Sequence, residues 1–265
     1  MNIFKHELKS GIRSAVSWTF SMILVSAVFL GVYPAFKESG EAVKKLMAGF
    51  PPEFLKALGF DVDLIFTPIG YYGLILNYII LLGAIQAMML GISIISKEFT
   101  GKTADFLMTK PVSRLRIMTS KLLSGLVLLL ATDAAAIGAI RIIIGLASGG
   151  PLNNKLYLML SLVILFIALT FYVIGILAAA IFQRIKSVAG VSNGIVLGFF
   201  LLGMIGEAIN AEKARYLVPF KYYDPVSIIA NSAYDSKFVA INIAIVVACL
   251  AAGFVLFSKR DIRAV

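Results

Sequence analysis

The sequence has little charge and almost none of the residues that build metal or disulfide sites. Only 14% of its 265 residues are charged, and it has one cysteine, Cys249, and one histidine, His6. These numbers exclude a disulfide framework and an ordinary Cys/His metal cluster. Because 60% of the residues are hydrophobic, a soluble domain of this length could not bury them all. Lipid is therefore the expected solvent for much of the chain.

Six stretches are long and apolar enough to span a bilayer. A transmembrane helix needs about 20 residues to do so. The sequence predicts an all-α membrane protein with a single transmembrane domain, residues 1–265. Residues 1–13 have the spacing of an amphipathic interfacial helix, 37–63 that of short outer interfacial helices, and 207–237 form a second outer segment. The predicted transmembrane helices cover residues 14–36, 64–96, 122–147, 156–182, 188–205 and 238–257.

Basic residues concentrate on one side of this predicted topology. If both termini, residues 97–121 and the turn 183–187 share a side, that side has 14 Lys and Arg residues and four acids. The other side has nine of each. Because Lys and Arg near helix ends resist translocation, the basic side is predicted to be cytoplasmic, with both termini on it.

The basic segment 97–121 also has helical spacing in its first half. Phe99, Thr103 and Phe106–Leu107 fall on one face, and Pro111 would end the helix. A short cytoplasmic helix with an aromatic face is suited to press on a soluble partner. The alternative is a solvated loop whose charges only set the topology.

The tripeptide Gly101–Lys102–Thr103 resembles the end of a nucleotide-binding P-loop. That motif needs a glycine five residues before Gly101, where Ser96 stands, and it needs a preceding strand, where a membrane helix is predicted. The chain is therefore not expected to bind or hydrolyse ATP, and we predict a non-catalytic subunit without a cofactor.

Asp133 lies inside the third predicted helix, where an ionised side chain costs a few kcal/mol. It is predicted either to line a translocation path or to hold a neighbouring helix. Its candidate partners are Asn77, Gln86 and Asn193, which with Asp133 are the predicted residues of a translocation path, or a residue of a partner subunit. Arg141, two turns further along, is predicted to reach the outer interface.

Three glycines, Gly190, Gly194 and Gly198, recur every fourth residue in the fifth predicted helix. Such a face allows close helix approach. Packing within the subunit and a seam between two subunits are both compatible with it.

The basic loop contains one longer motif, which comprises Glu98, Gly101, Lys102, Thr103, Phe106, Leu107, Pro111, Val112, Ser113 and Arg114, followed by Lys121. This motif resembles the cytoplasmic loop of ABC-2-type transporter permeases. The amphipathic start, six spans and basic C-terminus are also similar to that family, so the resemblance covers essentially the whole chain. The sequence departs from it at Lys102, which stands between Gly101 and Thr103 where many members have Gly-Thr directly.

The resemblance implies that this loop forms a coupling helix that docks in a groove of a separate ATPase subunit. Phe99, Phe106 and Leu107 would supply the buried contact, and charged residues would set its orientation at the rim. The docking set would be Glu98, Phe99, Gly101, Lys102, Thr103, Asp105, Phe106, Leu107, Pro111 and Arg114.

The resemblance implies the permease subunit of an ATP-driven exporter in a prokaryotic plasma membrane. Two ATPase copies, which would hold ATP and Mg, and a second copy of this chain or a related permease would complete it, with no nucleic acid. The alternatives are a self-contained secondary transporter, an intramembrane enzyme, and a non-transporting ABC-like sensor. The sequence leaves the substrate open among peptides, lipids, drugs and ions.

Overall fold

The computed structural model describes residues 3–58, 60–62, 64–100, 114–182, 185–209 and 211–259. Within these ranges the regular elements are all helical. Six helical segments are long and apolar enough to cross a membrane, which confirms the predicted all-α class with six spans. They are formed by α1 (Ile3–Gly31) with α2 (Tyr33–Glu38), α5 (Pro68–Thr100), α7 (Arg114–Ser148), α8 (Asn154–Ile181), α9 (Val188–Ala208) and α11 (Ser236–Lys259).

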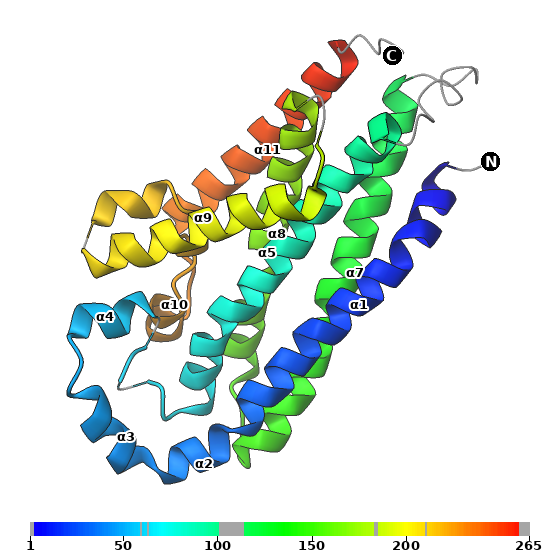
Figure 1. The fold of residues 1–265 in the computed structure, drawn as a ribbon. Coiled ribbons are helices and arrows are strands. Elements are labelled where there is room, and N and C mark those ends of the chain that lie inside the picture. The colour runs from blue at the N-terminus through cyan, green and yellow to red at the C-terminus, as the bar shows by residue number, and fades with distance from the viewer. Residues whose placement is uncertain are drawn as a thin grey trace.

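The shorter helices gather at one end of the bundle. Figure 1 shows α2, α3, α4 and α10 there, opposite the end at which α1 begins and α11 ends. We call the first the capped end and the second the basic end. The remaining short helices are α3 (Gly40–Met47), α4 (Pro52–Ala57), η1 (Glu212–Tyr216), η2 (Pro219–Lys221) and α10 (Pro225–Asn231).

Several helix limits differ from those expected from the sequence. No break separates residues 1–13 from 14–36, because α1 runs continuously from Ile3 to Gly31 and contains no proline. The next long helix begins at Pro68 rather than residue 64, since proline suits the first turn of a helix. Helix α7 begins eight residues before the predicted 122.

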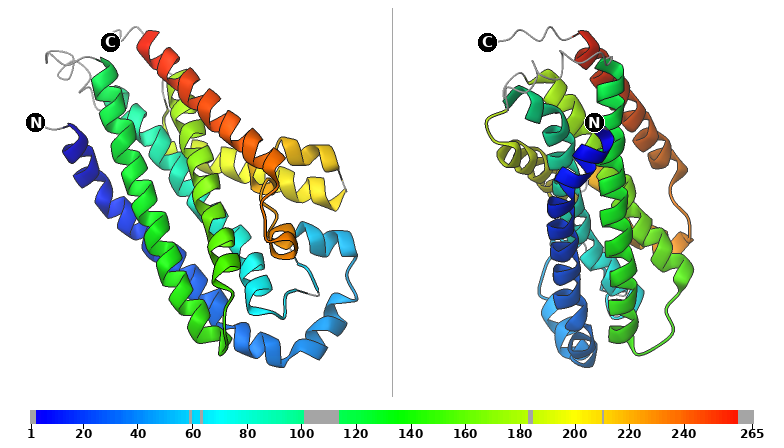
Figure 2. Two further views of the ribbon diagram at one scale, coloured as in Figure 1. Left: turned by 180° about the vertical axis from the view of Figure 1, so that it is seen from behind. Right: turned by 90° about the vertical axis from the view of Figure 1, so that its right-hand side faces the viewer.

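Helices α5 and α8 form the centre of the bundle, and their backbones touch at two glycines. A Cβ on Gly91 would lie 2.2 Å from the carbonyl oxygen of Tyr172, and a Cβ on Gly175 would lie 2.6 Å from that of Met88. Only glycine allows so close a crossing. Helices α1, α9 and α11 lie around this centre (Figure 2) and leave most of their surface exposed.

Tyrosine hydroxyls hold the capped end in place. That of Tyr234 donates to the carbonyl oxygen of Met159 in α8 at 2.7 Å and so ties this end to the bundle. That of Tyr222 donates to the carbonyl oxygen of Tyr216 at 2.8 Å, within the segment between α9 and α10. Burial raises the pKa of Tyr223 and Tyr234 to about 12, so both stay neutral near pH 7.

Candidate functional site

The predicted docking residues flank the connection between α5 and α7 at the basic end. Glu98 and Phe99 belong to the last turn of α5, and Arg114 is the first residue of α7. The other docking residues lie outside the described ranges, namely Gly101, Lys102, Thr103, Asp105, Phe106, Leu107 and Pro111. The coupling helix therefore stays a prediction. The described part of the site consists of the end of α5, the start of α7 and the residues that contact them.

A buried ion pair lies near the start of α7 and joins three helices. The Lys121 ammonium is 2.7 Å from Glu7 Oε1 in α1, and it donates to the carbonyl oxygen of Ile94 in α5 at 3.4 Å. Only 3% of Lys121 and 9% of Glu7 is exposed. Ile94 lies six residues before the end of α5, so the pair ties α1 to both helices that flank the predicted loop.

The physical cost of this pair explains why it acts as a fixed junction. Removing two charges from water is expensive, and close pairing with a further hydrogen bond offsets that cost. Loss of Lys121 would leave the Glu7 carboxylate buried without its ion-pair partner. Separation of α1 from α7 at this point would do the same, so the three helix ends are expected to move together.

Close packing between α1 and α7 sets the geometry of the pair. A Cβ on Gly11 would lie 2.2 Å from Leu128 Cδ1, so glycine lets α1 approach α7 one turn beyond Glu7. Sequence reasoning missed this contact, because it assigned Glu7 to an interfacial helix and Lys121 to the basic loop. The partners are 114 residues apart, and no local spacing joins them.

Asp133 lies deeper in α7 and differs sharply from this pair. It is 1% exposed, and neither carboxylate oxygen has a hydrogen-bond partner among the described residues. Arg141 does not reach it, because the Arg141 guanidinium donates to Asn154 Oδ1 at 2.7 Å. An unpaired buried carboxyl is costly in lipid as in protein, which marks Asp133 as a functional candidate.

Gln86 is brought next to this part of α7. Its Nε2 donates to the hydroxyl of Thr132 at 3.1 Å, while its Oε1 has no partner within the described ranges. Among the described residues, Gln86 Oε1 and both carboxyl oxygens of Asp133 are therefore acceptors that no donor reaches. Such a site suits a ligand or partner group that supplies a hydrogen-bond donor.

The other two predicted path residues lie elsewhere. Asn77 is nine residues from Gln86 along α5, about 13 Å at 1.5 Å per residue, and lines a cavity at the capped end. Asn193 is exposed on α9. The structure thus brings Gln86 close to the Asp133 region and places Asn77 and Asn193 away from it.

The glycine face of α9 meets open space within the subunit. A Cβ added to Gly194 or Gly198 would have no heavy atom within 4 Å, and one added to Gly190 would approach only Ser187 of its own turn. For the part of the chain that the structure describes, this leaves packing within the subunit without support.

No candidate metal centre is found in the described part of the chain, where no three His, Cys, Asp or Glu side chains gather. The described residues offer a buried ion pair at Lys121 and acceptor oxygens without a partner at Asp133.

Comparison with known proteins gives one strong match. A family model described as "ABC-2 family transporter protein" matches residues 1–262, which is nearly the whole chain. No curated protein matches the sequence.

Proposed function

The chain belongs to the ABC-2 transporter family, and from this premise we propose that it couples ATP hydrolysis in a separate ATPase subunit to the export of a substrate. Family membership makes it a multi-pass membrane protein and the permease subunit of an ABC transporter, a component that is generally non-catalytic and associates with an ABC ATPase. The coupling, the direction of transport and the assembly are our inferences.

The buried Lys121–Glu7 pair carries the coupling proposal. A force applied to the loop 97–121 enters the bundle through the end of α5 and the start of α7. Lys121 contacts both α5 and α1 at that point, so displacement of the loop would shift all three helices together. Closure of two ATPase copies on ATP would then bias the bundle between two packings through differential contacts.

The charge distribution supports an orientation with the basic end in the cytoplasm. In the predicted topology the side with both termini has 14 Lys and Arg residues against four acids, and the opposite side has nine of each. In a prokaryotic plasma membrane this orientation presents the predicted coupling helix to a cytoplasmic ATPase. The capped end would then face outward, where its short segments are too small to receive a binding protein, which favours export.

The open face of α9 supports assembly from two permease subunits. Large apolar side chains, including Leu201 and Ile205, lie exposed on the same helix as Gly194 and Gly198. A second copy of this chain, or a related permease, would cover that face and complete the translocation path. Six spans would then form half of the translocator.

One observation favours a second candidate, a self-contained secondary transporter. Asp133 is a buried carboxyl with no partner among the described residues, and intramembrane acids of this kind serve proton and ion relays in such transporters. This candidate requires transport activity by the chain without an ATPase.

Co-purification in mild detergent tests the proposed function. Wild-type protein and the double variant Phe99→Ala/Phe106→Ala are expressed with the candidate ATPase, and the amount of ATPase recovered is measured. The matched control is Phe50→Ala/Phe54→Ala, which removes two exposed rings stacked at the capped end. We expect the control to retain the ATPase and the loop variant to lose it. Equal recovery in both would contradict docking at the loop, and active transport without any ATPase would favour the second candidate.

A further inference from the structure

A cavity of about 420 Å³ lies at the capped end, between the first turns of α5, the last turns of α9, and α10. This volume falls in the range of small-molecule sites, which hold an apolar body and a few placed polar groups. Two rings, Phe60 and Phe220, line it together with aliphatic side chains of α5 and α10. Its polar groups therefore decide what it can bind.

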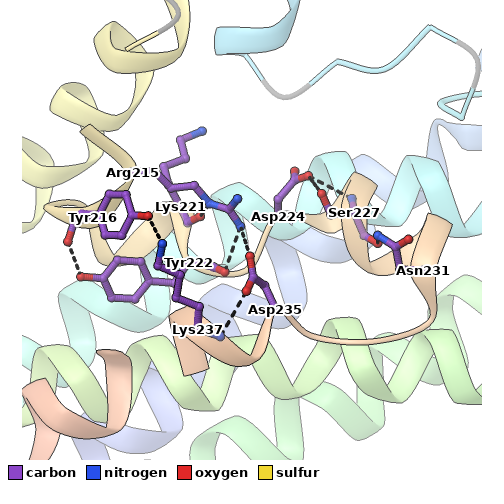
Figure 3. Close-up of polar contacts among 9 residues, drawn as sticks. All are labelled: Arg215, Tyr216, Lys221, Tyr222, Asp224, Ser227, Asn231, Asp235 and Lys237. Atoms are coloured by element: carbon purple, nitrogen blue, oxygen red, sulfur yellow. Dashed lines mark hydrogen bonds and ion pairs between the residues drawn. The ribbon is translucent and has the colours of Figure 1, made fainter. Parts of the chain in front are cut away.

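The basic residues in the wall are already engaged. Lys221 is 2.7 Å from Glu207 Oε2. The Arg215 guanidinium donates to the carbonyl oxygen of Lys221 at 2.8 Å and lies 3.9 Å from the ring centroid of Phe238. Figure 3 shows Arg215 also facing Asp235, 4.0 Å away. Each base therefore already has an acidic partner, Glu207 for Lys221 and Asp235 for Arg215.

Two acceptor groups in the same wall are not engaged. Asp224 uses one oxygen, Oδ2, to accept from the backbone N–H and the hydroxyl of Ser227 at 2.9 and 2.6 Å (Figure 3). Its Oδ1 has no hydrogen bond to the described residues, and neither has the half-buried amide of Asn77. Asp224 and Arg215 also line a smaller neighbouring cavity of about 290 Å³, so they form the partition between the two.

The balance of charge around the cavity is acidic. Three carboxylates line it, those of Asp61, Glu207 and Asp224, against the two engaged bases. A cation would gain a charge-assisted hydrogen bond to Asp224 Oδ1 and favourable contact with the aromatic faces. An anion would meet a net negative wall.

We propose that this cavity is a binding site for lipophilic amines, with the ammonium group on Asp224, the amide of Asn77 as a second polar contact, and the apolar body against Phe60 and Phe220. The inference does not rest on coupling to an ATPase, because binding is a property of this chain alone. The ammonium group could come from a free amine or from a lipid headgroup such as that of phosphatidylethanolamine.

The test is a fluorescence titration of the purified full chain in mild detergent with dansylcadaverine, a primary amine with an aromatic body. Empty micelles give the background, and dansylglycine, which carries a carboxylate instead, is the matched probe. We expect saturable binding of dansylcadaverine and none of dansylglycine. Asp224→Asn should weaken binding at least tenfold while keeping its hydrogen bond to Ser227, since Asn caps helices as well as Asp does.

Two further variants keep the test decisive. Val226→Trp fills the cavity without removing a polar contact of Asp224, so it should also weaken binding at least tenfold even if Asp224→Asn folds poorly. Glu41→Gln removes a carboxylate on α3 at the capped end that lines neither cavity and should leave binding unchanged. Unchanged binding in both cavity variants, equal loss in Glu41→Gln, or equal binding of dansylglycine would each overturn the assignment.

A competition experiment identifies the source of the ammonium group. Displacement of the probe by hexylamine but not by added phosphatidylethanolamine indicates a free amine. Displacement by phosphatidylethanolamine but not by phosphatidylglycerol indicates a lipid headgroup. Displacement by neither would overturn the recognition of an ammonium group.

Discussion

Helix α7 carries two buried ionisable residues whose surroundings are opposite. Lys121 is paired with Glu7 at 2.7 Å, whereas both oxygens of Asp133 lack a partner among the described residues. They are twelve residues apart, about 18 Å along the helix. Lys121 lies near the end of the bundle, where the N-terminal turns of α1 reach it. Asp133 lies deeper in the helix, next to Thr132, whose hydroxyl accepts from Gln86.

The difference shows how a buried charge can serve architecture or function. A paired charge holds its neighbours in place, because every movement that separates the partners exposes a bare ion to a medium of low dielectric. A buried ionisable side chain without a partner does not stabilise the isolated subunit. We therefore expect it to bind a ligand, line the translocation path or pair with a second subunit. The following variants test that distinction.

The largest effect is expected at Lys121. Lys121→Met leaves Glu7 buried without its partner and should lower the free energy of unfolding by about 3–5 kcal/mol. Thermal unfolding in mild detergent measures it. The double variant Glu7→Gln/Lys121→Met removes both charges, so its free energy of unfolding should fall clearly less than that of the single variant. A double variant that is at least as unstable would show that the pair does not act as a junction.

Asp133→Leu should change the free energy of unfolding in the opposite direction. Replacing a buried carboxyl without a partner by an apolar side chain is expected to leave the subunit as stable or to stabilise it by about 1–3 kcal/mol, the cost of a buried polar group that makes no hydrogen bond. Transport-coupled ATPase activity of the assembled complex should nevertheless fall. Asp133→Asn is the control, because it keeps the size of the side chain and removes only the carboxyl group. A loss of stability confined to the assembled complex would instead identify a partner residue from the second subunit.

A smaller loss of stability is expected from Thr132→Val. The change keeps the shape of the side chain but leaves Gln86 Nε2 without its acceptor, which costs about 1–3 kcal/mol for a buried polar group. The double variant with Gln86→Leu should recover most of that loss, because no polar group is then left unpaired. Unfolding midpoints of the two proteins under one condition give the comparison.

The smallest effect is expected at Asn193, which is exposed on α9. Asn193→Ala should change the stability of the isolated subunit by less than about 0.5 kcal/mol. Transport-coupled ATPase activity should also be unchanged if Asn193 lies away from the path. A loss of activity as large as that of Asp133→Leu would return Asn193 to the path and weaken the contrast between the two regions.

The transmembrane helices could be predicted from the sequence, because length and hydropathy alone decide whether a helix can cross a bilayer. Asp133 also stood out, because an acid in an apolar helix is costly wherever its neighbours lie. The pairing of Lys121 with Glu7 could not be predicted, because it depends on how closely α1 and α7 pack across 114 residues of chain. For the same reason the glycines of α9 left two interpretations open until their surroundings were known.

The unequal lengths of α5 on either side of its glycine crossing have a mechanical consequence. From Gly91 the helix extends about 14 Å to Thr100 and about 35 Å to Pro68. If α5 pivots at the point where its backbone meets Gly175, it is a lever with a short arm at the basic end. A displacement delivered to the short arm moves the opposite tip, which walls the cavity at the capped end, roughly two and a half times as far.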